Sequence, residues 1–236
     1  MKRICFAIII LIFTQDMSAQ LFSKERVQNL QNFDKPRFSW GYILGFNSYD
    51  YNFDYNIDAE ETDIVVDKGG LGFNVGLLGN MRINDYLDLR LEPMVTFTQR
   101  NLTYSGRQFR TEAEAFREVN STYVHIPLLL KISTKRLNNF KPFIVGGIST
   151  SLNLSSNENN PDDNNVGQFR TKTSTNYYEI GFGIDLYLYY FKFTPSIRGV
   201  FAMSDELVRD NDPNSPYTST IDKMSSRGVF INFTFQ

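Results

Sequence analysis

Apolar and polar residues alternate along most of this chain with the two-residue period that is typical of β-strands. Eight segments carry the pattern, and each is interpreted as one strand. They span about Phe38–Asn47, Leu71–Ile83, Leu87–Gln99, Tyr123–Ile132, Pro142–Leu154, Tyr177–Leu188, Phe191–Phe201 and Arg227–Gln236. In the fifth segment Gly and Ser are so frequent that its two faces are not assigned.

The sixth and seventh segments display the alternation most clearly. On one side of each stand only apolar residues, whereas the other side carries glycines, carboxylates on the sixth segment and cations on the seventh. A turn at Tyr189–Tyr190 places Asp185 diagonal to Lys192 and Glu179 diagonal to Arg198. That spacing is close enough for interaction across the strands.

The connections between the segments alternate in length. Short ones follow the second, fourth and sixth segments, at Asn84–Tyr86, Ser133–Asn139 and Tyr189–Tyr190, and long polar ones such as "SSNENNPDDNNVGQ" follow the others. This arrangement is typical of outer-membrane barrels with both termini in the periplasm. The predicted fold class is therefore all-β: an eight-stranded antiparallel transmembrane (outer-membrane) β-barrel with short periplasmic turns and long extracellular loops.

A soluble lipocalin-like barrel has the same period but turns its apolar face inward, around a ligand. Here the apolar face is strongly aromatic and is opposed by glycine and charge, which leaves no apolar interior for such a barrel. Aromatic residues make up 15% of the 236 residues, yet mean hydropathy is only −0.31, which argues against a helical membrane protein. The net charge of −2 gives no basic footprint for nucleic acid.

The N-terminus, "MKRICFAIIILIFTQDMSAQ", reads as a secretory signal peptide. Two cations precede an apolar run that is too short to cross a bilayer as a helix. We expect Sec-type export with cleavage near Ala19–Gln20, although Met17 is a large residue for its position before that cut. The predicted division is a signal peptide over 1–19, a periplasmic N-terminal leader over 20–36 and the outer-membrane β-barrel over 37–236. The single cysteine, Cys5, leaves with the signal peptide, so the mature chain has no thiol.

The polar faces of the strands predict a network of charges in the lumen. Its expected members are Arg82, Asp88, Arg90, Glu92, His125, Lys131, Glu179, Asp185, Lys192 and Arg198. An eight-stranded barrel has room inside for side chains only, so these groups should fill the lumen rather than open it. Buried charges that are unpaired are costly, and we therefore expect pairing across strands and no through-pore.

His125 is the only histidine and supports one enzymatic alternative. With Ser196 and Glu179 it would form the catalytic group of a lipid A-modifying barrel enzyme. A hydrogen-bonded lumen histidine is the favoured interpretation, so no catalytic residue, cofactor or small-molecule substrate is predicted. Asp162 and Asp163 lack the spacing of a calcium loop, and they and the acidic stretch "DAEETDIVVD" are interpreted as solvated surface.

The leader contains the segment "SKERVQNLQNFDKP". Ser23 can cap a short helix on which Val27, Leu30 and Phe33 form an apolar stripe. Such a helix would lie in the periplasm as a possible partner contact, or would plug the base of the barrel. A disordered tether is the equal alternative.

Four segments in order along the mature chain resemble the PorT family, barrel proteins of the type IX secretion system. They are "NLQNFDKPRFSWGYILGFN", "HIPLLLKISTKRLNNFKPFIVGGIS", "IGFGIDLYLYYFKFTPSIR" and "YTSTIDKMSSRGVFINFTF". The leader, the hairpin from Ile184 to Phe193 and the C-terminal "SSRGVFINFTF" carry most of the specificity. The resemblance implies an outer-membrane accessory protein needed for export of substrates with C-terminal secretion signals. It supplies no catalytic residue.

The functional hypothesis is thus a non-enzymatic outer-membrane component of type IX secretion that acts through protein–protein contacts. Its expected partners are outer-membrane lipid and other secretion components, with the leader and turns facing the periplasm and the wall facing a larger translocon. Nucleic acid and small-molecule substrates are not expected partners. The alternatives are a general outer-membrane barrel of porin or adhesion type and, with less support, the lipid A-modifying enzyme.

Overall fold

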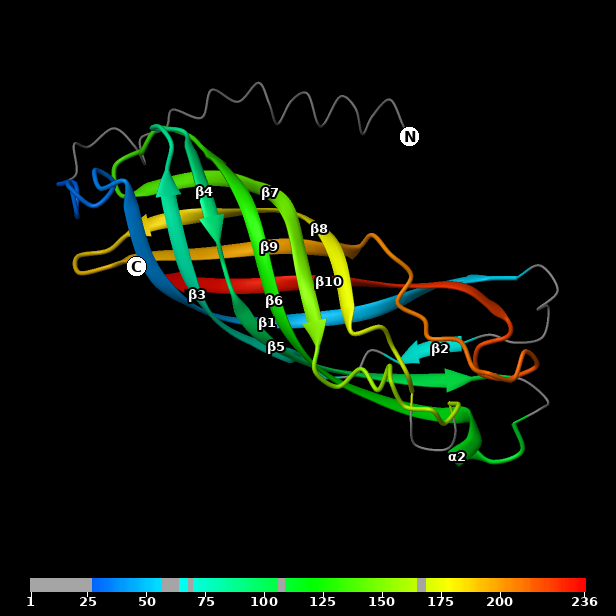
Figure 1. Ribbon diagram of the computed structural model, residues 1–236. Helices are drawn as coiled ribbons and strands as arrows, with labels where there is room; N and C mark the ends of the chain where they lie inside the picture. Colours follow the sequence, from blue (N-terminus) through cyan, green and yellow to red (C-terminus); the bar gives the residue numbers. More distant parts are fainter. Residues whose placement is uncertain (1–26, 57–63, 68–69, 106–108, 165–168) are drawn as a thin grey trace, which may run out of the picture.

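The computed structural model describes residues 27–56, 64–67, 70–105, 109–164 and 169–236, so the predicted signal peptide and Ser23, the predicted helix cap, lie outside the described residues. One antiparallel sheet closes into an elongated barrel (Figure 1). Its strands are β1 (Phe38–Tyr55), β2 (Ile64–Asp67), β3 (Gly72–Arg82), β4 (Leu87–Leu91), β5 (Met94–Tyr104), β6 (Phe116–Ser133), β7 (Phe140–Asn153), β8 (Ser174–Tyr187), β9 (Lys192–Ala202) and β10 (Ile221–Phe235). A single helical turn, α2 (Glu112–Ala115), precedes β6. No helix in these described ranges is long and apolar enough to cross a membrane.

The barrel closes at β1, which pairs with β10 on one side and with β3 on the other. β4 and β5 follow one another along the same position of the wall, between β3 and β6. The sequence predicts a single strand there, but the ladder is interrupted at Glu92–Pro93 because proline has no N–H to donate. Counting β4 and β5 together, and leaving out the short β2 that pairs only with the end of β5, the closed wall has eight strands, and the predicted eight-stranded antiparallel barrel is confirmed.

Short turns gather at one end of the barrel, together with the C-terminus (Figure 1). In the β3–β4 turn the Asn84 Oδ1 atom accepts hydrogen bonds from the backbone N–H groups of Tyr86 and Leu87, which holds the turn tight. The β8–β9 turn is closed by Leu188 N–H donating to the Phe191 carbonyl, at the predicted place. The long connections lie at the opposite, extracellular end.

Two strands run far beyond their predicted lengths. β1 and β6 each have 18 residues, whereas about 9–11 tilted residues suffice to cross a bilayer. The additional residues continue toward the long loops, where β2 pairs with the end of β5. Ile64–Asp67, interpreted from the sequence as part of a solvated acidic loop, therefore forms a strand.

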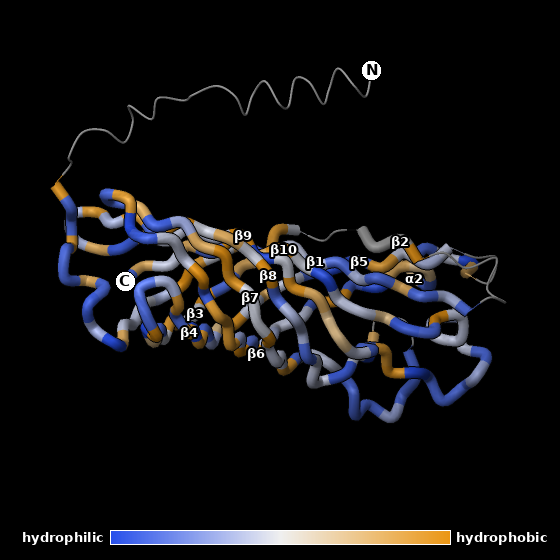
Figure 2. Tube along the Cα trace, turned by 90° about the horizontal axis from the view of Figure 1, so that it is seen from above, coloured by the Kyte–Doolittle hydropathy of each residue, from blue (hydrophilic) through white to orange (hydrophobic). Residues whose placement is uncertain are grey.

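A belt of exposed apolar side chains surrounds the half of the barrel nearest the short turns. Its members include Phe38, Trp40, Tyr42, Leu44, Phe46, Phe73, Val75, Leu77, Phe97, Leu128, Leu130, Ile144, Ile148, Ile180, Phe182, Ile184, Val229 and Ile231. Above the belt the outward positions become polar, and Asp50 pairs there with Arg227 at 2.8 Å. The long loops at that end are largely hydrophilic (Figure 2). The belt is the surface that faces lipid.

The composition of the interior also varies with height. Within the belt, charged and hydroxyl side chains share the interior with two apolar clusters, one of Ile43, Tyr49, Leu78, Met94, Tyr177, Val200 and Phe230 and one of Leu129, Phe143 and Val145. In the extracellular extension the interior holds an apolar cluster made of Tyr51, Ile64, Leu102, Tyr104, Val119, Phe169, Leu207, Tyr217, Ile221 and Met224. The expectation that the barrel has no apolar interior is thus wrong at both levels, and the largest apolar cluster lies in the extension, where water rather than lipid surrounds the wall.

Candidate functional site

Ion pairs from four wall strands meet in the centre of the lumen. Glu92 accepts from Arg90 Nη2 and from Arg198 Nη1, each at 2.8 Å. Arg198 Nε also lies 3.4 Å from Glu179 Oε2, and Glu179 Oε1 lies 2.8 Å from His125 Nε2. All five side chains are buried. Because each carboxylate has two partners, the charge removed from water is compensated locally.

A second ion pair lies nearer the periplasmic end. Lys131 Nζ is 2.6 Å from Asp185 Oδ2, and the Thr194 hydroxyl donates to Asp185 Oδ1 at 2.8 Å. The ammonium group also lies over the ring of Phe143, 4.3 Å from its centroid. Asp88 is buried directly across from Lys131 in the β4–β6 ladder.

The β8–β9 register explains these positions. Gly181 is opposite Arg198 and Tyr187 is opposite Lys192, so Glu179 and Asp185 lie diagonal to the two cations. Lys192, however, has its nearest carboxylate on the leader: its Nζ is 3.9 Å from Asp34 Oδ1.

Arg82 does not belong to the interior network. Its guanidinium pairs with Asp85 of the β3–β4 turn, and its side chain is 32% exposed. It is at the last position of β3, where the wall ends, so the alternation that predicts an inward direction places it at the rim instead.

The leader residues from 27 to 36 lie across the periplasmic end of the barrel. They form turns and not the predicted helix, and Leu30 has a φ of 50°. Arg136 donates to the carbonyls of Asn29 and Leu30 while its guanidinium stacks over the Tyr187 ring, 3.7 Å from its centroid. These contacts favour the alternative in which the leader plugs the base.

The three leader residues predicted to contact a partner therefore have different environments. Phe33 lies against Lys192, with the ammonium 4.9 Å from the ring centroid. Leu30 is half-buried. Only Val27, which is 83% exposed, presents its side chain fully to the periplasm.

Sequence reasoning missed the buried cations of the extension. Arg100 is fully buried, lies 3.9 Å from the Tyr51 ring centroid and donates to Ser226 at 3.0 Å. Arg117 lies over the ring of Tyr217 at 4.4 Å. Arg100 continues the inward phase of its strand one residue beyond the predicted end at Gln99, which is the signal that reveals it.

Two long loops fold over the extracellular mouth and bind each other. Arg170 of the β7–β8 loop pairs with Asp210 of the β9–β10 loop at 2.9 Å and with Asp163 at 3.2 Å. Asp163 also accepts from the backbone N–H of Asn211 at 2.7 Å, which lowers the pKa of its carboxyl. Asp163 is thus a link within the loop cap rather than solvated surface. The part of the chain that the structure describes contains no group of three or more potential metal ligands.

Glu206, in the same β9–β10 loop, has an unusual environment. Its side chain is buried and accepts hydrogen bonds from the backbone N–H and the hydroxyl of Ser226, at 3.0 and 2.8 Å. Burial is the largest influence and raises the pKa of this carboxyl above its ordinary value.

The hypothetical catalytic group has no access to a lipid substrate. His125 is 0% exposed and is enclosed by the rings of Tyr177 and Phe230. Its Nε2 is occupied by Glu179, whereas the Ser196 hydroxyl donates to the Asn232 carbonyl at 3.5 Å.

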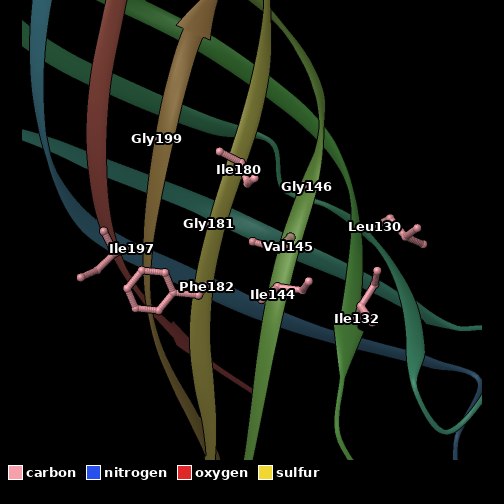
Figure 3. A pocket seen from close by; sticks show the side chains of 10 residues that line it. All are labelled: Leu130, Ile132, Ile144, Val145, Gly146, Ile180, Gly181, Phe182, Ile197 and Gly199. Atoms are coloured by element: carbon pink, nitrogen blue, oxygen red, sulfur yellow. The ribbon is translucent and has the colours of Figure 1, made fainter. Parts of the chain in front are cut away.

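The lipid-facing wall contains a recess of about 620 Å³ across β6, β7, β8 and β9 (Figure 3). Ile180 of β8 pairs with Gly146 of β7 on one side and with Gly199 of β9 on the other. Because the two glycines have no side chains, the outer surface is hollowed at this point. The surrounding side chains shown in Figure 3 are all apolar. The recess is a surface for lipid or for another membrane protein, and none of its lining residues has a polar side chain.

A family model for the outer membrane protein β-barrel domain matches residues 19–208. Among solved structures, the chain is similar to the outer membrane protein OprG from Pseudomonas aeruginosa, with 16% identity over 83% of this chain and 94% of that one and a TM-score of 0.46. Neisserial surface protein A (NspA) shows 9% identity over 84% and 97%, with a TM-score of 0.43. Ail of Yersinia pestis shows 11% identity over 83% and 96%, with a TM-score of 0.36. No curated protein matches the sequence. Because the family model covers most of the chain, this protein belongs to the family of outer membrane proteins with a β-barrel domain.

Proposed function

We propose that this barrel is a non-enzymatic component of the type IX secretion system that acts by contact with other proteins. The observation that carries the proposal is the closure of the lumen at three levels. The leader covers the periplasmic end, ion pairs fill the centre and the two linked loops cover the extracellular end. A barrel without a path through it works through its surfaces.

The periplasmic surface is the best candidate for a protein contact. Val27 of the leader and the two tyrosines of the β8–β9 turn, Tyr189 and Tyr190, are all more than 80% exposed. Exposed large apolar groups beside the membrane favour protein or interfacial contact. The recess around Gly146 offers a second contact within the membrane, since small residues let transmembrane elements approach closely.

Export assays test the proposal directly. Deleting the gene should abolish secretion of proteins with C-terminal secretion signals, and the wild-type gene should restore it. Val27→Glu should reduce export while the barrel still assembles, because the Val27 side chain is 83% exposed. Asn214→Glu, which introduces the same carboxylate in an exposed extracellular loop, is the control for added charge. Normal export in the deletion strain would refute the secretion role.

A general outer-membrane barrel remains the second candidate, and the folded extracellular loops favour its adhesion form. Their cap is held by Arg170 between two acidic partners and presents a fixed surface to the outside. Loss of surface attachment together with normal export in the deletion strain would select this candidate. His125→Ala tests the enzymatic alternative. We expect the mass spectrum of lipid A to stay unchanged in this variant, which would exclude an enzyme built on His125.

A further inference from the structure

A groove of about 580 Å³ lies at the periplasmic rim, between the end of the leader and the β3–β4 turn. It is lined by Lys35, Arg37, Met81, Arg82, Ile83 and Asn84. The backbones of the two sides are joined, since Arg82 N–H donates to the Arg37 carbonyl at 2.8 Å. The groove therefore belongs to the folded barrel and does not depend on a separate loop.

Two of its three cations are uncompensated. Arg82 pairs with Asp85. Lys35 and Arg37 are exposed, and neither has a carboxylate of the described chain within ion-pair distance. Lys and Arg side chains placed in this way attract phosphate groups, for which arginine offers paired N–H donors.

The groove opens directly onto the lipid-facing belt. Phe38 follows Arg37 and is paired with Met81 in the β1–β3 ladder, and both Phe38 and Ile83 are more than half exposed. Trp40, 74% exposed, is the next outward residue of β1. Cations above an apolar wall with an aromatic side chain match a phospholipid, whose headgroup and acyl chains lie in the same order.

The distribution of charge over the two ends supports a lipid on this side. Among the described residues, charged side chains near the periplasmic end, apart from the buried interior groups, are mostly basic: Lys35, Arg37, Arg82, Lys135 and Arg136 against Asp34 and Asp85. Those of the extracellular end are mostly acidic: Asp50, Asp54, Glu112, Glu114, Glu118, Glu158, Asp162, Asp163, Asp205, Asp210, Asp212 and Asp222 against Arg110, Arg170, Lys172, Arg209, Lys223 and Arg227. The periplasmic rim is thus the end suited to an anionic leaflet.

We propose that this groove binds the anionic headgroup of a phospholipid of the periplasmic leaflet, with Lys35 and Arg37 on the phosphate and Met81 and Ile83 under the acyl chains. The occupant is a lipid rather than an acidic protein because the groove continues into the lipid-facing belt. This site adds a lipid contact to the barrel that is independent of its role in secretion.

Trp40 is the only tryptophan of the chain and reports on this site. The folded full-length mature protein in a zwitterionic detergent would be titrated with phosphatidylglycerol or phosphatidylcholine carrying brominated acyl chains, which quench tryptophan fluorescence. Each cation near an anionic surface contributes about 1 kcal/mol, or about fivefold. The wild type should therefore prefer phosphatidylglycerol by roughly 25-fold, and Lys35→Gln/Arg37→Gln should lose that preference.

The matched control is Lys172→Gln/Lys223→Gln, which removes two cations from the extracellular end. It should keep the wild-type preference, and retention of the folded form on unboiled gels should be the same for all variants. Equal quenching by both lipids in the wild type would overturn the proposal. An equal loss in the control would also overturn it, because it would indicate bulk charge. Displacement of the lipid by inorganic phosphate or by an acidic peptide at similar concentration would refute a lipid site.

Discussion

The buried pair of Lys131 and Asp185 gives a quantitative test of the filled lumen. The two side chains are almost fully buried and their charged atoms are 2.6 Å apart. Asp185→Leu leaves the ammonium without its ion-pair partner, and Lys131→Met leaves the carboxylate with the Thr194 hydroxyl. Because an uncompensated buried charge is costly, each single change should lower the free energy of unfolding by about 3–5 kcal/mol.

The double variant should behave differently. With both charges gone, the remaining cost is the Thr194 hydroxyl without its acceptor, about 1–3 kcal/mol. The Lys131→Met/Asp185→Leu protein should therefore be more stable than either single variant. Such strong non-additivity is the signature of two groups that act as a pair.

Folding into phospholipid vesicles at increasing urea, followed by the fluorescence of Trp40, measures these differences. The same cycle on Asp50 and Arg227, an exposed pair at 2.8 Å, is the control and should give about 0–1 kcal/mol of coupling. If the two interior changes were additive, or if each cost no more than the exposed pair, the interior would be hydrated. The inference of a filled lumen would then fail.

Three further predictions use other features. Gly147→Ala should lower the free energy of unfolding by about 1–3 kcal/mol, because its Cβ would lie 2.2 Å from the Leu128 carbonyl oxygen. Gly146→Ala should be neutral in the same urea assay, because its Cβ would lie 3.5 Å from the nearest atom. Since the folded state holds the Glu206 proton more tightly, stability should fall as pH rises above about 4.5, and Glu206→Gln should lack that part of the pH dependence in unfolding curves. In planar bilayers the wild type should give no stable porin-sized conductance, and a large steady current would contradict the closed lumen.

The membrane-level wall was predictable because its two faces meet opposite environments. Lipid outside and packed charge inside force strict alternation, and strands such as β8 follow it residue by residue. The diagonal positions of Glu179 and Arg198 then follow from one turn placed at Tyr189–Tyr190. The prediction that Arg82 belongs to the lumen network is wrong, because alternation does not indicate at which residue the strand leaves the wall.

The extracellular extension was harder to predict because its partners are distant in sequence. Phe169 and Leu207 come from loops that are polar overall, and each is buried only because the two loops fold over the barrel. The Thr171–Leu207 bridge and the Arg170–Asp210 ion pair that hold them together join residues 36 and 40 positions apart. The leader presented the same difficulty, since its turn at Leu30 is fixed by Arg136 from another part of the chain.

The two halves of the interior follow from one physical rule applied to two surroundings. Where lipid surrounds the wall, apolar side chains gain nothing by turning inward, so the interior is free to hold paired charge. Where water surrounds it, the same strands must bury apolar side chains inside, and Leu102, Tyr104 and Val119 are the result. Outward residues change from apolar to polar near the height of the Asp50–Arg227 pair, and the largest apolar cluster of the interior lies beyond that height. A barrel that is packed by different means at both levels leaves its ends and its outer wall as the surfaces on which partners can act.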